Sequence, residues 1–299
     1  MAVDFARGHT GPLSAPIPPP LPPGSIVVLP GRGEVFVRDT GPRSDGAPTL
    51  LMLHGWTVSA DINFFAAYEI LASSYRVVAL DHRGHGRGMR SREEFSLEDC
   101  ADDAAALLRV LNVPAGRTIA LGYSMGGPIA LLLARRHPDL VAGLVSQATA
   151  LEWRESVADR GKWLFLNIAE VGLRVSSGDG VVERVMDRAV DVSPEIEPLR
   201  SWLEAEIQRG VGRALVDAGR ALSKFDSRPW AHELKLPAVV CVTMRDKLVP
   251  PRKQRVLAKK LRADIIEIDG DHDVTLVDGP GYAAATLAAV DMVASKLIQ

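Results

Sequence analysis

The chain has 299 residues, of which 47% are hydrophobic and 24% are charged, a balance typical of folded globular proteins rather than disordered or fibrous ones. Its 35 basic and 37 acidic residues give a net charge of -2, so we expect no binding to nucleic acid. No segment has the length and apolarity of a signal peptide or of an integral membrane segment. These features predict a cytoplasmic protein with either one large α/β domain carrying an insertion or two ordinary domains.

The N-terminal residues 1–24 are rich in proline, with seven prolines between positions 11 and 24. Proline fixes φ and removes an amide donor, which favours an extended polyproline II segment. We interpret residues 1–24 as an arm lying along the domain. The less favoured alternative is a ligand for a proline-binding module.

Beyond the arm, short aliphatic runs alternate with longer helix-like stretches, which is typical of parallel strands joined by crossover helices. The expected strands are residues 25–29, 35–39, 49–53, 77–80, 118–121, 143–147, 238–242 and 265–268. The first two are expected to be antiparallel. Ser96 is a predicted N-cap of a helix over residues 96–112, and residues 282–298 form an amphipathic helix that packs the C-terminus onto the sheet.

Residues 151–227 break this alternation, because they contain helical patterns but no strand-like run. Several glycines divide the stretch into short helices, at positions 172, 178, 180, 210 and 212. We predict a helical cap here, inserted between two halves of one α/β core at residues 25–150 and 228–299. The large apolar side chains of the cap either form an acyl pocket or pack the cap onto the core: Trp153, Trp163, Phe165, Leu166 and Trp202.

The strongest local motif is Gly122-Tyr123-Ser124-Met125-Gly126-Gly127, between a predicted strand and a helix-like run. Glycines at these positions permit a tight strand-to-helix turn, since side chains there would collide with neighbouring backbone. Such a turn presents a serine hydroxyl at the carboxyl edge of the sheet. Ser124 is therefore the predicted nucleophile.

A serine hydroxyl needs a general base, and histidine is the side chain whose ordinary pKa suits that role. We favour His272, which follows a predicted strand, over other histidines in the arm, at a helix end or in a connector: His9, His137 and His232. The acid in this arrangement follows a strand between nucleophile and base, which indicates Asp246. Asp271 and Asp273 are rivals, but sequence neighbours of His272 are poorly placed to accept from its ring.

A tetrahedral oxyanion needs converging amide donors, usually one after the nucleophile and one from the loop after the third strand. These positions are Met125 and Trp56. His54 is expected to brace that loop rather than act as a base. Trp56, Tyr123 and Val249 are the predicted substrate contacts.

Residues 81–88 read DHRGHGRG, which suggests a metal site or a phosphate loop at first sight. The run lacks the spacing of a zinc protease motif and of a phosphate-binding loop, so we expect a structural turn and no metal. The widely separated Cys100 and Cys241 are expected to be free, buried thiols.

The motifs HGW, DHRGHGRG, GYSMGG, DKLVP and GDHD occur in the order seen in the α/β-hydrolase superfamily, and the chain resembles its capped bacterial esterases and lipase-like hydrolases over residues 25–299. The resemblance implies an α/β fold with a mostly parallel eight-stranded sheet, helices on both faces and a cap after the sixth strand. It assigns the nucleophile, acid and base to Ser124, Asp246 and His272, and the oxyanion amides to Trp56 and Met125. A serine nucleophile argues against the epoxide hydrolase and haloalkane dehalogenase branches.

The expected function is hydrolysis of a small-molecule carboxylic ester, with a small or medium apolar acyl group, through an acyl-enzyme and without a cofactor. Carbon-carbon bond hydrolysis and cofactor-free perhydrolysis are alternatives on the same residues, because fold and triad do not determine the substrate. A catalytically idle receptor or scaffold is the alternative from another class. The sequence makes no prediction of oligomeric state.

Overall fold

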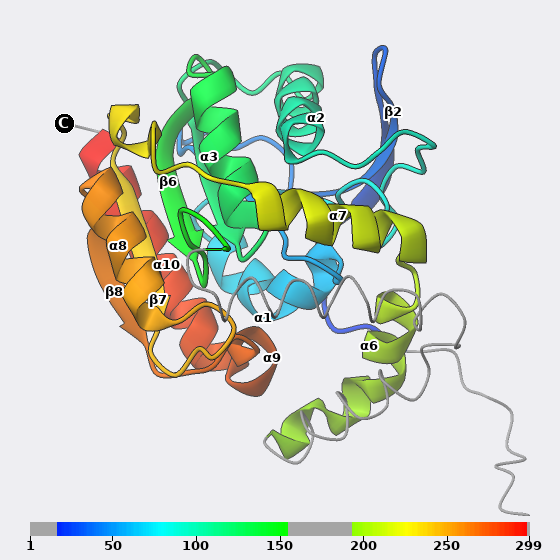
Figure 1. Ribbon diagram of the computed structural model, residues 1–299. Coiled ribbons are helices and arrows are strands. Elements are labelled where there is room, and N and C mark those ends of the chain that lie inside the picture. Colours follow the sequence, from blue (N-terminus) through cyan, green and yellow to red (C-terminus); the bar gives the residue numbers. More distant parts are fainter. Residues whose placement is uncertain (1–16, 155–192, 298–299) are drawn as a thin grey trace, which may run out of the picture.

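A computed structural model describes residues 17–154 and 193–297 of the chain (Figure 1). One eight-stranded sheet has the strand order β1-β2-β4-β3-β5-β6-β7-β8. The strands are β1 (Gly24–Leu29), β2 (Gly33–Asp39), β3 (Thr49–Leu53), β4 (Arg76–Leu80), β5 (Thr118–Tyr123), β6 (Val141–Gln147), β7 (Ala238–Thr243) and β8 (Asp264–Ile268). β2 pairs antiparallel with β1 and β4, and the other pairs are parallel. All the predicted strands are confirmed.

The central strands are buried along their whole length because helices cover both faces of the sheet. Every residue of β3, β4, β5 and β7 is buried. One apolar cluster joins the sheet to α2 (Leu97–Val110), α3 (Gly126–Arg136) and α8 (Pro251–Leu261). A second joins the other face to α1 (Ala60–Ala72) and α10 (Gly279–Leu297). The predicted fold class is therefore confirmed.

The predicted ends of two helices can be compared directly. Ser96 caps α2, and its hydroxyl accepts from the Asp99 amide at 2.9 Å and donates to the Asp99 carboxylate at 2.7 Å. The final helix, α10, begins at Gly279 rather than residue 282 and packs against β6 and β7. Both predicted helices are therefore present, and the C-terminal one packs on the sheet as expected.

The insertion after β6 is helical where the structure describes it, with η1 (Pro194–Leu199), α6 (Arg200–Ile207) and α7 (Gly212–Lys224). Gly210 and Gly212 lie at the break between α6 and α7, which Figure 1 shows as two helices joined by a turn. Glu152 and Asp226 form an isolated antiparallel bridge where the chain leaves the core and returns to it. The predictions for positions 163, 165, 166, 172, 178 and 180 lie outside the described residues.

The described end of the proline-rich segment runs beside β2. The carbonyl of Pro22 accepts from the Arg38 guanidinium at 2.9 Å, and that of Pro23 accepts from the Asp39 amide at 3.1 Å. Residues 1–16 of the predicted arm lie outside the described residues. The short elements η2 (Ala231–Glu233) and α9 (Val274–Val277) complete the fold. No helix within residues 17–154 and 193–297 is long and apolar enough to cross a membrane.

Candidate active site

Ser124 sits on the turn between β5 and α3, in the left-handed region with φ +52°. A Cβ atom at Gly122 would collide with the carbonyl of Gly126, and one at Gly126 would collide with the carbonyl of Leu53. The turn is therefore possible only with glycine on both sides of the serine. It places the Ser124 side chain at the carboxyl edge of the sheet.

Loops after three strands bring Ser124, His272 and Asp246 into one hydrogen-bonded chain. His272 Nε2 lies 3.0 Å from Ser124 Oγ, and His272 Nδ1 lies 2.8 Å from Asp246 Oδ2. The side chain of Asp246 is fully buried, whereas that of His272 is 21% exposed. The His272 ring can therefore reach both Ser124 and a ligand in the adjoining cavity.

Several hydrogen-bond donors surround the Asp246 carboxylate, and some of the residues that provide them were not predicted to belong to the site. Its Oδ1 accepts from the amides of Leu248 and Val249 at 2.8 and 2.7 Å. Its Oδ2 also accepts from the Thr243 hydroxyl at 2.8 Å, and Gln254 donates to Thr243 Oγ1 and to the Val249 carbonyl. These donors occupy both carboxylate oxygens and fix the direction in which Oδ2 faces His272.

The rival carboxylates have other partners. Asp271 accepts from the amides of Lys247 and His272, at 3.0 and 2.8 Å. Asp273 is exposed and lines the cavity beside His272. Among the rival histidines, His137 contacts Asp102 at 2.8 Å on the far end of α3, and His9 lies outside the described residues.

The loop after β3 lies against Ser124. A Cβ atom at Gly55 would be 3.4 Å from Ser124 Cβ, and the Gly55 amide donates to Asn63 Oδ1 at 2.6 Å. His54 Nε2 accepts from the His82 amide at 2.9 Å. Burial lowers the pKa of His54 to about 4, so its ring is neutral near pH 7 and one nitrogen is available as an acceptor. His54 thus braces the loop.

Trp56 connects this loop to the insertion. Its indole Nε1 donates to the carbonyl of Leu215 on α7 at 2.6 Å. A Cβ atom at Gly219, one turn further along α7, would lie 2.6 Å from Trp56 Cζ2. The indole therefore packs directly on the helix backbone at Gly219. Met125, the other predicted oxyanion residue, is the N-cap of α3, where amides lack intrahelical acceptors.

The other predicted substrate contacts also line the cavity next to Ser124. Val249 is buried in its wall. Tyr123 lines it too, but only 2% of the residue is exposed, and its hydroxyl donates to the backbone carbonyl of His272 at 2.8 Å. Tyr123 thereby holds the loop that carries the base. Its contact with substrate stays a prediction.

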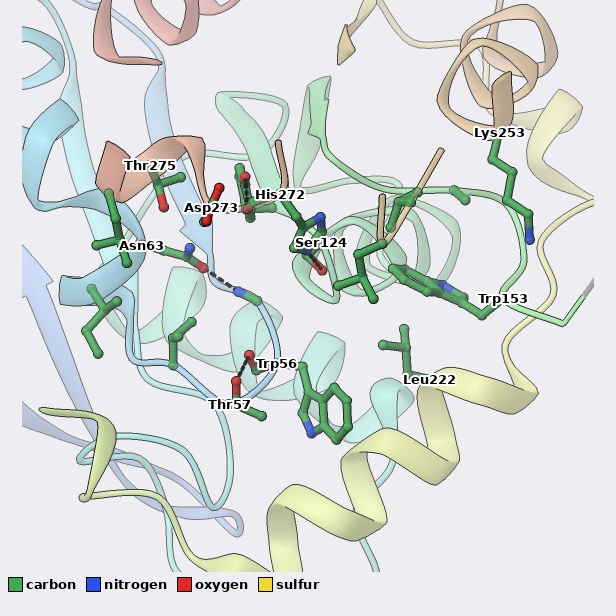
Figure 2. Close-up of a pocket in the computed structure, with 18 of the residues that line it drawn as sticks. Trp56, Thr57, Asn63, Ser124, Trp153, Leu222, Lys253, His272, Asp273 and Thr275 are labelled. Carbon is green, nitrogen blue, oxygen red and sulfur yellow. Dashed lines mark hydrogen bonds between the residues drawn. The ribbon is translucent and has the colours of Figure 1, made fainter. Parts of the chain in front are cut away.

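The cavity has a volume of about 410 Å³, and Figure 2 shows Ser124 and His272 near its centre. Trp153 and Leu222 form part of its apolar wall, whereas Trp202 packs away from it against Phe65, with ring centroids 5.7 Å apart. Trp153 therefore lines the cavity, whereas Trp202 serves to pack the insertion onto the core, and an acyl pocket stays a prediction. The same wall contains a charged pair that was not predicted, Glu152 and Lys253.

The DHRGHGRG run forms the loop after β4. The Asp81 carboxylate accepts from the amides of Ala60 and Arg87, both at 2.8 Å, which ties the loop to the start of α1. Burial lowers the pKa of His82 and His85 well below the usual range, so both rings are neutral. The run therefore forms a turn that holds the start of α1 and the loop at His54. Cys100 and Cys241 are buried and free, as predicted.

Comparison with known proteins identifies relatives across the chain. Residues 48–186 match the family model of the alpha/beta hydrolase fold. The chain is 30% identical to a putative non-heme haloperoxidase of Mycobacterium phage D29, over 81% of this chain and 87% of that protein. It is 25% identical to a monoacylglycerol lipase of Mycolicibacterium smegmatis, over 79% and 81% of the two chains.

Among solved structures, the enol-lactonase from Burkholderia xenovorans LB400 superimposes with a TM-score of 0.76 at 20% identity. The superposition covers 89% of this chain and 100% of the lactonase chain. That likeness shows a shared fold, and the haloperoxidase relative extends it to shared sequence over most of both chains. The chain is a hydrolase and belongs to the α/β-hydrolase family.

Proposed function

We propose that this protein is a serine hydrolase that cleaves carboxylic esters through an acyl-enzyme intermediate. The proposal rests chiefly on the hydrogen-bonded chain Ser124–His272–Asp246, whose serine opens onto a cavity lined mainly by apolar groups. A serine hydrogen-bonded in this way to a histidine that a carboxylate orients is the arrangement that acyl transfer requires.

In the first step, His272 takes the proton of the Ser124 hydroxyl as the oxygen attacks the acyl carbonyl. Asp246 keeps the proton of the ring on Nδ1, so that Nε2 faces the serine, and stabilises the imidazolium that forms. His272 then protonates the leaving alcohol. In the second half, it activates a water that attacks the acyl-enzyme and regenerates the serine.

The tetrahedral intermediate carries a negative charge on the former carbonyl oxygen. The amides of Met125 and Trp56 are the proposed donors to it, because both belong to segments that flank Ser124. The N-terminus of α3 adds a favourable dipole. The cavity volume of about 410 Å³ suits a small or medium acyl group.

Perhydrolysis is a second candidate, because the relative with 30% identity carries a haloperoxidase name. Hydrogen peroxide would then replace water as the acceptor of the acyl group, and a peracid would be released from the same intermediate. Production of peracid from acetate and peroxide, compared with ester hydrolysis by the same preparation, separates the two activities.

A fluorophosphonate probe tests the proposal, because it phosphonylates an activated serine. We expect labelling of the wild type and of Ser295→Ala, which alters an exposed serine on α10, but none of Ser124→Ala. A series of p-nitrophenyl esters of increasing acyl length, read as kcat/KM, then defines the acyl group. Folded wild-type protein that remains unlabelled would contradict the proposal.

A further inference from the structure

The cavity beside Ser124 has a polar wall that the proposed mechanism does not use. Asn63 of α1 and Thr275 of α9 belong to it, and only 6% and 3% of these residues are exposed. The exposed Asp273 completes the polar wall. In Figure 2 these three residues lie together on one side of Ser124, and Trp153 lies on the other.

The Asn63 side chain is oriented by the loop after β3. Its Oδ1 accepts from the Gly55 amide at 2.6 Å. A backbone N–H group can only donate, so the oxygen must face Gly55 and the NH₂ group is left to face the cavity. A Cβ atom at Gly55 would lie 3.2 Å from Asn63 Oδ1 and 3.4 Å from Ser124 Cβ, which places Asn63 close to Ser124.

The polar wall has unused hydrogen-bonding capacity. Among the residues that the structure describes, neither Asn63 Nδ2 nor Thr275 Oγ1 has a hydrogen-bond partner, and the Asp273 carboxylate forms no hydrogen bond or ion pair. Buried polar groups are usually paired. A ligand that displaces water from this wall must therefore replace the hydrogen bonds of that water, or it binds less tightly.

The place of His272 indicates which part of an ester reaches the polar wall. His272 Nε2 faces Ser124, and Asp273 and Thr275 follow His272 directly in the chain. The short helix α9 also packs against α1, which carries Asn63. Because His272 must protonate the leaving alcohol, that alcohol lies on this side of Ser124.

We infer that Asn63, Asp273 and Thr275 form a subsite for a second hydroxyl group on the leaving alcohol. Asn63 can donate to the oxygen of that hydroxyl, the Asp273 carboxylate can accept from its O–H group, and Thr275 can do either. An alkyl group would leave buried donors unpaired, and a cationic group could not accept from Asn63 or Thr275. The assignment to the leaving alcohol rests on the proposed function.

Three butanoate esters test this subsite, with 2-hydroxyethyl, propyl or 2-(trimethylammonio)ethyl as the alcohol part. The first two have equal numbers of non-hydrogen atoms. Titration of the released butanoate gives kcat/KM, which is divided by the rate constant of the same ester with hydroxide to remove differences in intrinsic reactivity. Because the acyl group and His272 are common to all three, the ratio between two esters reports on the alcohol alone.

The ratio of 2-hydroxyethyl to propyl ester is compared in wild type, in Asp273→Ala/Thr275→Val and in Thr118→Val. Thr118 is the matched control, because its hydroxyl is also buried and has no partner within the described part of the chain. It lies at the start of β5, whereas Ser124 follows the end of that strand. Thr275→Val alone is used if circular dichroism shows that the double variant does not fold.

We expect the wild type and Thr118→Val to favour the 2-hydroxyethyl over the propyl ester by about fivefold or more, with the cationic ester below the 2-hydroxyethyl ester. In the double variant this ratio should fall by about threefold or more. A smaller ratio in the wild type, a ratio that the double variant retains, an equal loss in Thr118→Val, or a preference for the cationic ester overturns the subsite.

The proposed function is tested separately by turnover of p-nitrophenyl acetate, whose leaving group has no second hydroxyl. Turnover of this ester without any preference among the butanoates contradicts the subsite and leaves the esterase intact. If no ester is turned over, N-(2-hydroxyethyl)butanamide and N-propylbutanamide are bound to the wild type by calorimetry. Tighter binding of the hydroxyethyl amide then supports the subsite and contradicts only the esterase, whereas any other result overturns both.

Discussion

Replacement of Gly219 by alanine should lower kcat although residue 219 belongs to the insertion. The new Cβ would lie 2.6 Å from Trp56 Cζ2, about 1 Å closer than an ordinary carbon-carbon contact. The indole cannot simply swing aside, because its Nε1 donates to the carbonyl of Leu215 on the same helix at 2.6 Å. The displacement therefore passes to the backbone of Trp56, the proposed oxyanion donor.

A misplacement of about 1 Å lowers rates by roughly 10²-fold, and loss of one oxyanion donor lowers kcat by about 10²- to 10³-fold. Since the indole and its helix can share the shift, we expect Gly219→Ala to reduce kcat by about 10- to 100-fold. KM should change little, because the donor acts mainly on the transition state. Steady-state kinetics with p-nitrophenyl acetate measures both parameters.

Gly212→Ala is the matched control in the same helix, since nothing lies within 4 Å of a Cβ atom there. It should keep the wild-type kcat. Removal of a helical glycine should leave the melting temperature of Gly212→Ala unchanged or slightly higher, whereas the close contact at residue 219 should lower that of Gly219→Ala. A folded Gly219→Ala protein with kcat within about twofold of the wild type would refute the link between α7 and the oxyanion site.

Three further outcomes follow from the same geometry. Asp246→Asn should reduce kcat by about 10⁴-fold while the protein stays folded, as kinetics and circular dichroism would check. In either orientation the new NH₂ group faces another donor, namely the Leu248 amide or the Thr243 hydroxyl and His272 Nδ1, so the side chain no longer fixes the His272 tautomer. Tyr123→Phe removes the hydroxyl bonded to the His272 carbonyl at 2.8 Å and should lower kcat by up to about fivefold, equivalent to roughly 1 kcal/mol, and an unchanged kcat would argue against that bond as a support for His272. The pKa of His54 is about 4 when folded and about 6.5 when unfolded, so acidification protonates the unfolded chain first. The free energy of unfolding should therefore fall by about 1.4 kcal/mol for each pH unit of acidification between those values. Urea titrations at several pH values should show a weaker dependence of this free energy on pH for His54→Asn.

Sequence patterns sufficed for the centre of the sheet because its strands are buried on both faces and consist mainly of continuous apolar runs. Their ends were harder to predict where polar residues belong to the strand. Arg76 begins β4, one residue before the predicted start, because its guanidinium pairs with Asp39 of the neighbouring strand at 2.7 Å. No local signal reveals such a partner, which lies 37 residues away in the chain.

The candidate site likewise contains residues that the sequence predicts and residues that it does not. Ser124, Asp246 and His272 follow strands, so the parallel sheet predicts that they meet at one edge. Lys253 and Gln254 lie in the strongly charged run PRKQRVLAKKL, which suggests an exposed helix. The helical period provided a signal, since both positions share a face with the buried Leu257, Ala258 and Leu261 of that run.

The Glu152–Lys253 contact spans 101 residues, and the contact between Trp56 and α7 spans 159, so both depend on how the insertion returns to the core. The strand ends carry the proposed catalytic residues, whereas these two contacts shape the cavity beside Ser124. The fold shared with an enol-lactonase at 20% identity does not determine what this cavity holds, because one fold hosts many substrates. Kinetics of Gly219→Ala test whether the contact of Trp56 with α7 also controls the rate.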